Sequence, residues 1–82
     1  MNPAEAEAQQ VRNLLLQHDD QYRRFAEQHH QLDHRLHELT DKQYLSTSEQ
    51  LEQMTLKKRK LALKDRMEEI AREYAVAHSR AS

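Results

Sequence analysis

The fold of this chain is indicated first by residues 11–39, which read VRNLLLQHDDQYRRFAEQHHQLDHRLHEL. Apolar side chains recur here at alternating spacings of four and three residues, which is typical of the seam of a helix in a coiled coil. Only two histidines interrupt the series, which is Val11, Leu15, His18, Tyr22, Phe25, His29, Leu32, Leu36 and Leu39. A periodic stretch of this length predicts one long helix over about residues 4–40.

A second helix is predicted over about residues 47–78. Ser46 suits the N-cap position, and Glu49 follows three residues later, which is the spacing of a capping box. The apolar stripe of this helix is less regular and shifts between Leu61 and Leu63. Its members are Leu51, Met54, Leu61, Leu63, Met67, Ile70, Tyr74 and Ala77.

The two helices are predicted to fold back on each other as a long antiparallel hairpin. The turn between them covers about residues 41–46, and connections of this length usually join antiparallel neighbours. A register centred on this turn places Leu36 opposite Leu51. The predicted fold class is therefore all-α, with one coiled-coil-like hairpin domain over residues 1–82.

The composition excludes several classes of functional site. The chain has 82 residues, 13 Lys and Arg against 14 Asp and Glu, a formal net charge of −1, and no Gly, Cys or Trp. Without Gly it cannot form a P-loop, a dinucleotide-binding turn or a nucleophile elbow. Without Cys it has no disulfide, no thiolate nucleophile and no Cys-based zinc site. A hairpin also lacks the concave pocket of an active site, so we expect no enzymatic activity and no cofactor.

No membrane segment is expected. The longest aliphatic run is Leu14–Leu16, whereas a signal peptide needs roughly 7–15 apolar residues and a spanning helix about 20. The apolar face is a narrow seam without the large aromatic residues that anchor interfacial helices. We therefore expect a cytoplasmic protein without a membrane partner.

A lone hairpin leaves the flanks of its seam exposed to water, and such thin cores are marginally stable. We therefore expect self-association into a dimer or larger oligomer, most simply a four-helix bundle, or docking on a partner helix. The predicted interaction seam comprises Leu15, Tyr22, Phe25, Leu32, Leu36, Leu51, Leu61, Leu63, Met67 and Ile70. Further leucines beside the seam can face another chain or stand as ordinary surface residues, namely Leu14, Leu16, Leu56 and Leu63.

Two segments of the chain resemble the YdcH-like family of small bacterial proteins. The first is HQLDHRL at residues 30–36, and the second is LKKRKLALKDRM at residues 56–67, with Tyr44-Leu45 before the cap. The family usually has Pro after the cap residue, where this chain has Thr47. The resemblance implies a bacterial α-helical hairpin. It implies no mechanism and no catalytic or ligand residues, because the family's biochemical role is unknown.

Four consecutive basic residues form the sharpest local feature, and we call Lys57, Lys58, Arg59 and Lys60 the basic cluster. None has an acidic residue three or four positions away, where helical ion pairs form. One interpretation is a layer of interhelical ion pairs with Glu27 and Asp33, which would set the register or the choice of partner. The alternative is a site for the phosphates of a nucleic acid.

Histidines gather at the end of the first predicted helix. His30, His34 and His37 share one face, and a spacing of four residues lets two imidazoles bind one divalent ion. A structural zinc site needs four ligands and supporting hydrogen bonds, and the sequence indicates neither. We expect no metal site and keep these three residues as weak candidates. The sequence thus predicts a structural or interaction protein, with nucleic-acid binding as the alternative.

Overall fold

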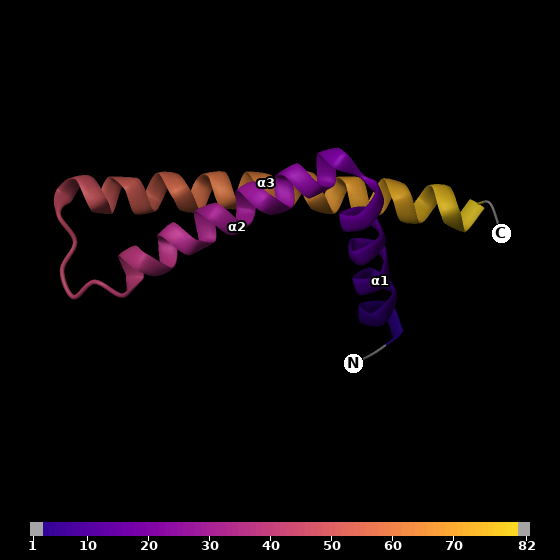
Figure 1. The fold of residues 1–82 in the computed structure, drawn as a ribbon, viewed down its shortest axis with the longest axis horizontal. Coiled ribbons are helices and arrows are strands. Elements are labelled where there is room, and N and C mark those ends of the chain that lie inside the picture. Colours follow the sequence, from indigo (N-terminus) through magenta and orange to yellow (C-terminus); the bar gives the residue numbers. More distant parts are fainter. Residues whose placement is uncertain (1–2, 81–82) are drawn as a thin grey trace.

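The computed structural model describes residues 3–80, and the side chains of residues 3–78. Within this range it contains α1 (Pro3–His18), α2 (Asp20–Thr40) and α3 (Thr47–Arg80), and no strand. With 34 residues, α3 is a rod along which α2 lies, while α1 turns aside (Figure 1). The described part of the chain is therefore all-α, as predicted.

The helix expected over residues 4–40 is divided at Asp19. The backbone of Asp19 is extended, with φ −114° and ψ 111°, and its side chain accepts a hydrogen bond of 2.8 Å from the backbone N–H of Tyr22. Asp is among the favoured N-cap residues, whereas inside a helix its side chain competes with the backbone for hydrogen bonds. The prediction of one continuous helix is therefore wrong, because the cap ends α1 and begins α2.

The start of α3 confirms the predicted capping box. The Ser46 hydroxyl accepts a hydrogen bond of 3.1 Å from the Glu49 backbone N–H, and the Glu49 carboxylate accepts one of 3.0 Å from the Ser46 backbone N–H. Lys42 in the loop forms an ion pair with the same carboxylate. Two backbone N–H groups that the helix itself leaves unpaired are satisfied in this way, which fixes where α3 begins.

The hydrophobic core is small. Among the described residues, the buried hydrophobic side chains are Leu15, Tyr22, Leu36, Leu39 and Leu56. Leu36 and Leu39 of α2 pack with Leu56 of α3 near the loop, whereas Leu15 and Tyr22 are buried on either side of the Asp19 break. Because hydrophobic stabilisation scales with the apolar area removed from water, this core leaves little reserve of stability.

The two packed helices meet in a different register from the predicted one. Leu36 packs with Leu56, whereas Leu51, its expected partner, keeps 60% of its surface exposed. Asp33 of α2 likewise pairs with Lys60 of α3. The predicted register is therefore wrong by more than one helical turn. Figure 1 shows the cause, because α3 begins beyond the end of α2 and the loop spans the offset.

The molecule is elongated. Its radius of gyration is 16.0 Å, and its extents are 54 × 27 × 17 Å, whereas a compact domain of this length has a radius of gyration of about 12 Å. Much of each helix therefore faces solvent. None of the helices in the described range is both long enough and apolar enough to cross a membrane.

The cap at Asp19 leads to a prediction on stability. Asp19→Ala removes the acceptor for the Tyr22 N–H and should lower the free energy of unfolding by about 1 kcal/mol. Asp19→Asn keeps a good capping residue and should change it by only a few tenths of a kcal/mol. Thermal unfolding followed by circular dichroism measures both, and equal stability of Asp19→Ala and wild type would contradict the cap.

The ion pair and capping box at Glu49 lead to a prediction on acid stability. Hydrogen bonds from Lys42 and from Ser46 hold the pKa of Glu49 at about 2, below its value of about 4.5 in an unfolded chain. A pKa lowered by folding contributes stability above the unfolded value, and this is lost as the pH falls. The melting temperature should therefore fall between about pH 4.5 and pH 2. Glu49→Gln should show a weaker fall, and an identical pH profile would contradict the assignment.

Candidate interaction surface

The helix α3 carries apolar side chains on two opposite faces. The inner face follows a spacing of four and three residues without interruption, and all its members are buried or half-buried, namely Glu49, Gln53, Leu56, Lys60, Leu63, Met67, Ile70 and Tyr74. This face is the one that packs against α2 and α1. The inner face extends from the loop to the far half of α3. It is therefore the regular heptad seam of this helix.

The outer face of α3 carries Leu51, Met54 and Leu61, which we call the outer stripe. These side chains are 60%, 57% and 59% exposed. With 100° of rotation per residue, they lie about 150° around the helix from Leu56, on the side away from the core. Val76, also more than half exposed, lies on the same side further along α3. Large apolar residues thus face water over the first half of α3 and again at Val76 near its end.

The structure divides the residues of the predicted seam into a buried group and an exposed group. Most of its residues are buried or half-buried within the chain, namely Leu15, Tyr22, Phe25, Leu32, Leu36, Leu63, Met67 and Ile70. The other two, Leu51 and Leu61, belong to the outer stripe. Leu56 was placed beside the seam, either facing another chain or as an ordinary surface residue, and both alternatives are wrong because it is buried in the core. The heptad spacing from Leu56 through Leu63 to Ile70 was the signal for its burial.

The basic cluster does not form one patch. Consecutive helical residues point about 100° apart, so its four side chains are spread around α3, and only Lys57 and Lys60 share one groove. Lys60 forms an ion pair and hydrogen bond with Asp33 of α2, which lowers the pKa of Asp33. Lys57 lines a groove on the same side of the α2–α3 contact, and Arg59 lines a groove on the other side. Lys58 is exposed on the outer face, between the members of the outer stripe.

A second interhelical ion pair was not predicted. The Arg35 guanidinium donates two hydrogen bonds of 2.9 Å to the two carboxylate oxygens of Glu52 and a third of 3.0 Å to Glu38. These contacts raise the pKa of Arg35 and lower that of Glu52. Because both side chains are more than a third exposed, we assign the pair a modest part in stability and a larger part in register. Glu27, an expected partner of the basic cluster, forms no ion pair with any described residue.

The groove beside Lys60 has a positive wall. We call it the basic groove; it encloses about 360 Å³, and Lys57, Lys60 and Lys64 line it from α3. The other wall comes from α2, namely His29, Asp33, Leu36, His37 and Thr40, and Leu61 of α3, a member of the outer stripe, also borders the groove. Lys64, which lies outside the predicted cluster, therefore joins two of its members, because a spacing of three and four residues keeps them on one face.

The histidine candidates do not converge on a metal site. His34 lies 3.1 Å from Glu38, and His37 lies 3.6 Å from Asp33, and both contacts are made within α2. Across the described range, no group of three or more His, Cys, Asp or Glu side chains could hold a metal ion. His30 is exposed and makes no contact of this kind within that range.

Comparison with known proteins identifies a family. The model of a protein family described as a protein of unknown function (DUF465) matches residues 23–71 of the chain. The matched segment covers most of α2, the loop and nearly the first three-quarters of α3, including the Arg35–Glu52 and Asp33–Lys60 pairs. The search of curated proteins and the search of solved structures found no match.

Proposed function

The chain belongs to the DUF465 family, whose function is unknown, and we propose that it is a cytoplasmic, non-enzymatic protein that self-associates through α3. The observation that carries this proposal is the outer stripe of Leu51, Met54 and Leu61. A helix that packs on one side of a bundle normally has a polar opposite face. Here the first part of that face carries three large apolar side chains, which indicate a second partner there, whereas its later positions include the charged residues Asp65, Glu69 and Arg72.

The surface area supports a partner of substantial size. The accessible surface is 6573 Å² for a chain of 9.8 kDa, whereas a compact monomer of this mass exposes about 5,200 Å². The difference is about 1,400 Å². A standard protein–protein interface buries about 800 Å² on each partner, so the excess is large enough for one such interface.

A second copy of the chain is the partner that we propose. In a two-fold symmetric dimer the same patch serves both subunits, so the outer stripe of one α3 would cover that of the other. Such a dimer requires only that the α3 helices of the two chains pack at an interaxial distance of about 8–10 Å, which is usual for packed helices. The resulting assembly would be a bundle in which each chain contributes α3 to the centre.

The proposal predicts that charges on the outer stripe dissolve the oligomer. Leu51→Glu with Leu61→Glu should raise the dissociation constant at least about a hundredfold, because apolar contacts are lost and carboxylates would be buried. Sedimentation equilibrium should give twice 9.8 kDa or more for the wild type and 9.8 kDa for the variant. Helicity should be unchanged, because both leucines are exposed in the single chain.

Tyr44 provides the matched control, since it is 83% exposed in the loop and lies outside the stripe. Tyr44→Glu adds one of these carboxylates to an exposed residue outside the stripe and should leave the mass unchanged, whereas each single stripe variant, Leu51→Glu or Leu61→Glu, should already weaken association. A wild type that sediments at 9.8 kDa at every concentration would refute self-association. Equal dissociation by the Tyr44 and stripe variants would refute the assigned surface.

The basic groove supports a second candidate function, which is binding of nucleic-acid phosphates. Lys57 and Lys64 line it without an ion pair to any described residue, and two histidines stand opposite. Against this, Asp33 neutralises Lys60 within the groove, and the chain as a whole has a formal net charge of −1. Such binding would be weak and would fall steeply with salt.

This second candidate predicts a difference between two variants of equal charge. Lys57→Gln with Lys64→Gln removes groove charges, whereas Lys58→Gln with Arg59→Gln removes the same charge from outside the groove. Fluorescence anisotropy with a labelled DNA duplex at low salt should then show at least about tenfold weaker binding for the first variant only. Equal affinities, or no binding by the wild type, would exclude the groove as a phosphate site.

A further inference from the structure

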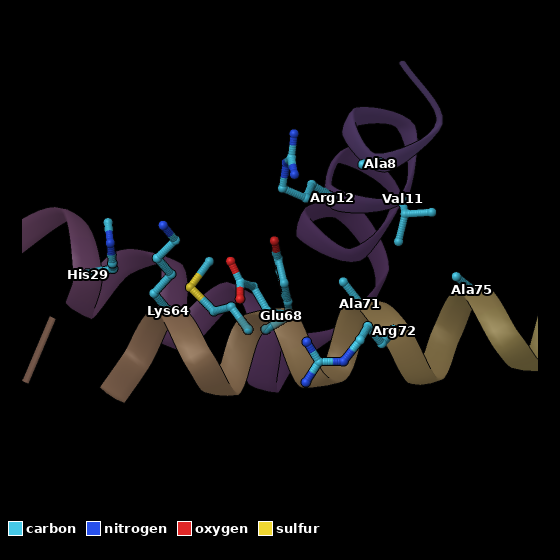
Figure 2. A pocket seen from close by; sticks show the side chains of 11 residues that line it. Ala8, Val11, Arg12, His29, Lys64, Glu68, Ala71, Arg72 and Ala75 are labelled. Atoms are coloured by element: carbon cyan, nitrogen blue, oxygen red, sulfur yellow. The ribbon is translucent and has the colours of Figure 1, made fainter. Parts of the chain in front are cut away.

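A cavity lies between α1 and α3, on the side of the molecule where α1 turns away (Figure 2). It encloses about 380 Å³, which is within the range of small-ligand pockets. All three helices contribute to its lining, which consists of Ala8, Val11, Arg12, Tyr22, His29, Lys64, Met67, Glu68, Ala71, Arg72 and Ala75. The break at Asp19 turns α1 out of line with α2, and in this orientation α1 contributes Ala8, Val11 and Arg12 to the lining (Figure 1).

The floor of the cavity is apolar. Ala8 of α1 faces Ala71 and Ala75 of α3 across it, and these side chains end at Cβ (Figure 2). Val11 and Met67 complete the apolar surface. Water gains few hydrogen bonds against such walls, so an apolar group that fills the space is favoured over water.

Tyr22 brings a polar atom to this apolar site. Its side chain is only 2% exposed and lines the cavity, yet its hydroxyl forms no hydrogen bond with any described residue. No described side-chain oxygen or nitrogen is both fully inaccessible and unpaired. The hydroxyl therefore keeps some accessible surface, and the cavity is a space that the Tyr22 side chain lines. Burial raises the pKa of Tyr22, so the group remains a hydrogen-bond donor at neutral pH.

The charges around the cavity are mostly positive. Arg12 of α1 lines the cavity and donates a hydrogen bond of 2.8 Å to the Gln9 side chain, while Lys64 and Glu68 line it from α3 (Figure 2). Arg72 and His29 also contribute to the lining. Neither Lys64 nor Arg72 forms an ion pair with a described residue, and Glu68 is the one acidic group of the lining. An anion at this rim is therefore favoured over a cation.

We propose that this cavity binds an amphipathic monoanion, an aliphatic carboxylate whose chain lies against Ala8, Ala71 and Met67 and whose carboxylate accepts a hydrogen bond from the Tyr22 hydroxyl. Arg12 and Lys64 supply the positive charge around the carboxylate. A purely apolar ligand would leave the Tyr22 hydroxyl unpaired, and a cationic one would meet three basic side chains. The carboxylate of an anionic amphiphile pairs with the Tyr22 hydroxyl and with the basic side chains, while its aliphatic chain covers the apolar floor.

Binding of laurate, below its micelle concentration, tests this proposal in the full chain by isothermal titration calorimetry. The wild type should bind one laurate per chain. Tyr22→Phe keeps the ring and should weaken binding about tenfold, as expected for loss of a hydrogen bond to a charged group. Arg12→Gln should weaken it about threefold or more, whereas Arg24→Gln, at an exposed residue outside the cavity, should have no effect.

A cavity-filling variant provides the decisive comparison. Ala71→Leu places a larger side chain in the floor and should abolish laurate binding, whereas Ala77→Leu, at an exposed position of α3 outside the cavity, should not. Circular dichroism checks that the variants remain helical. If Ala71→Leu loses helicity, Ala8→Leu fills the same space from α1.

Three outcomes would overturn the proposal. Laurate binding that survives in Ala71→Leu and Ala8→Leu would place the ligand elsewhere. Equal affinity for dodecyltrimethylammonium would show that the positive rim has no role and that only the apolar chain is recognised. Absence of laurate binding together with a changed oligomer mass in Ala71→Leu would show that a second chain occupies the cavity. These readings are independent of the outer stripe, so they separate this inference from the proposed self-association.

Discussion

The packing of the inner face of α3 is the constraint on which the rest of the structure depends. Leu56, Leu63 and Ile70 repeat at seven-residue intervals, and α2 with α1 must cover them. Burial of this row contributes more free energy than a register centred on the loop would. The first turn of α3 therefore lies beyond the end of α2, and the loop spans the offset. The choice of the inner row therefore determines the register of α2 on α3, the path of the loop, and how far α3 extends beyond the end of α2.

The interhelical ion pairs stabilise this register of α2 on α3, but they do not determine it. Arg35–Glu52 and Asp33–Lys60 join α2 to α3 on exposed or half-exposed surface, where ion pairs contribute little to stability. Either pair would nevertheless be broken by a shift of one helical turn, because the partners would separate by about 5 Å. The ion pairs therefore select among registers that the apolar row already allows.

The sequence predicted the all-α class and the cap at Ser46, because both depend on local chemistry. It failed at Asp19, where the 4-3 spacing is continuous and only the capping preference of one residue marks the break. It also failed to assign the two rows of α3, since the predicted stripe included Leu51 and Leu61 and omitted Leu56, although Leu56 shares a seven-residue spacing with Leu63 and Ile70. Periodicity identifies apolar faces, and only tertiary packing decides which of two faces is covered. The cavity could not be predicted, because it exists only through the angle at Asp19.

Unequal helix lengths explain why both candidate surfaces exist. With 34 residues, α3 is longer than the 21-residue α2, and the 16-residue α1 is set at an angle to both. The chain can therefore cover one side of α3 but not the other, and it covers the far half of that side only loosely. The outer stripe is the side left bare, and the cavity is the loosely covered part. A chain with this geometry has more apolar surface than it can bury alone, and a partner molecule is the remaining way to remove it from water.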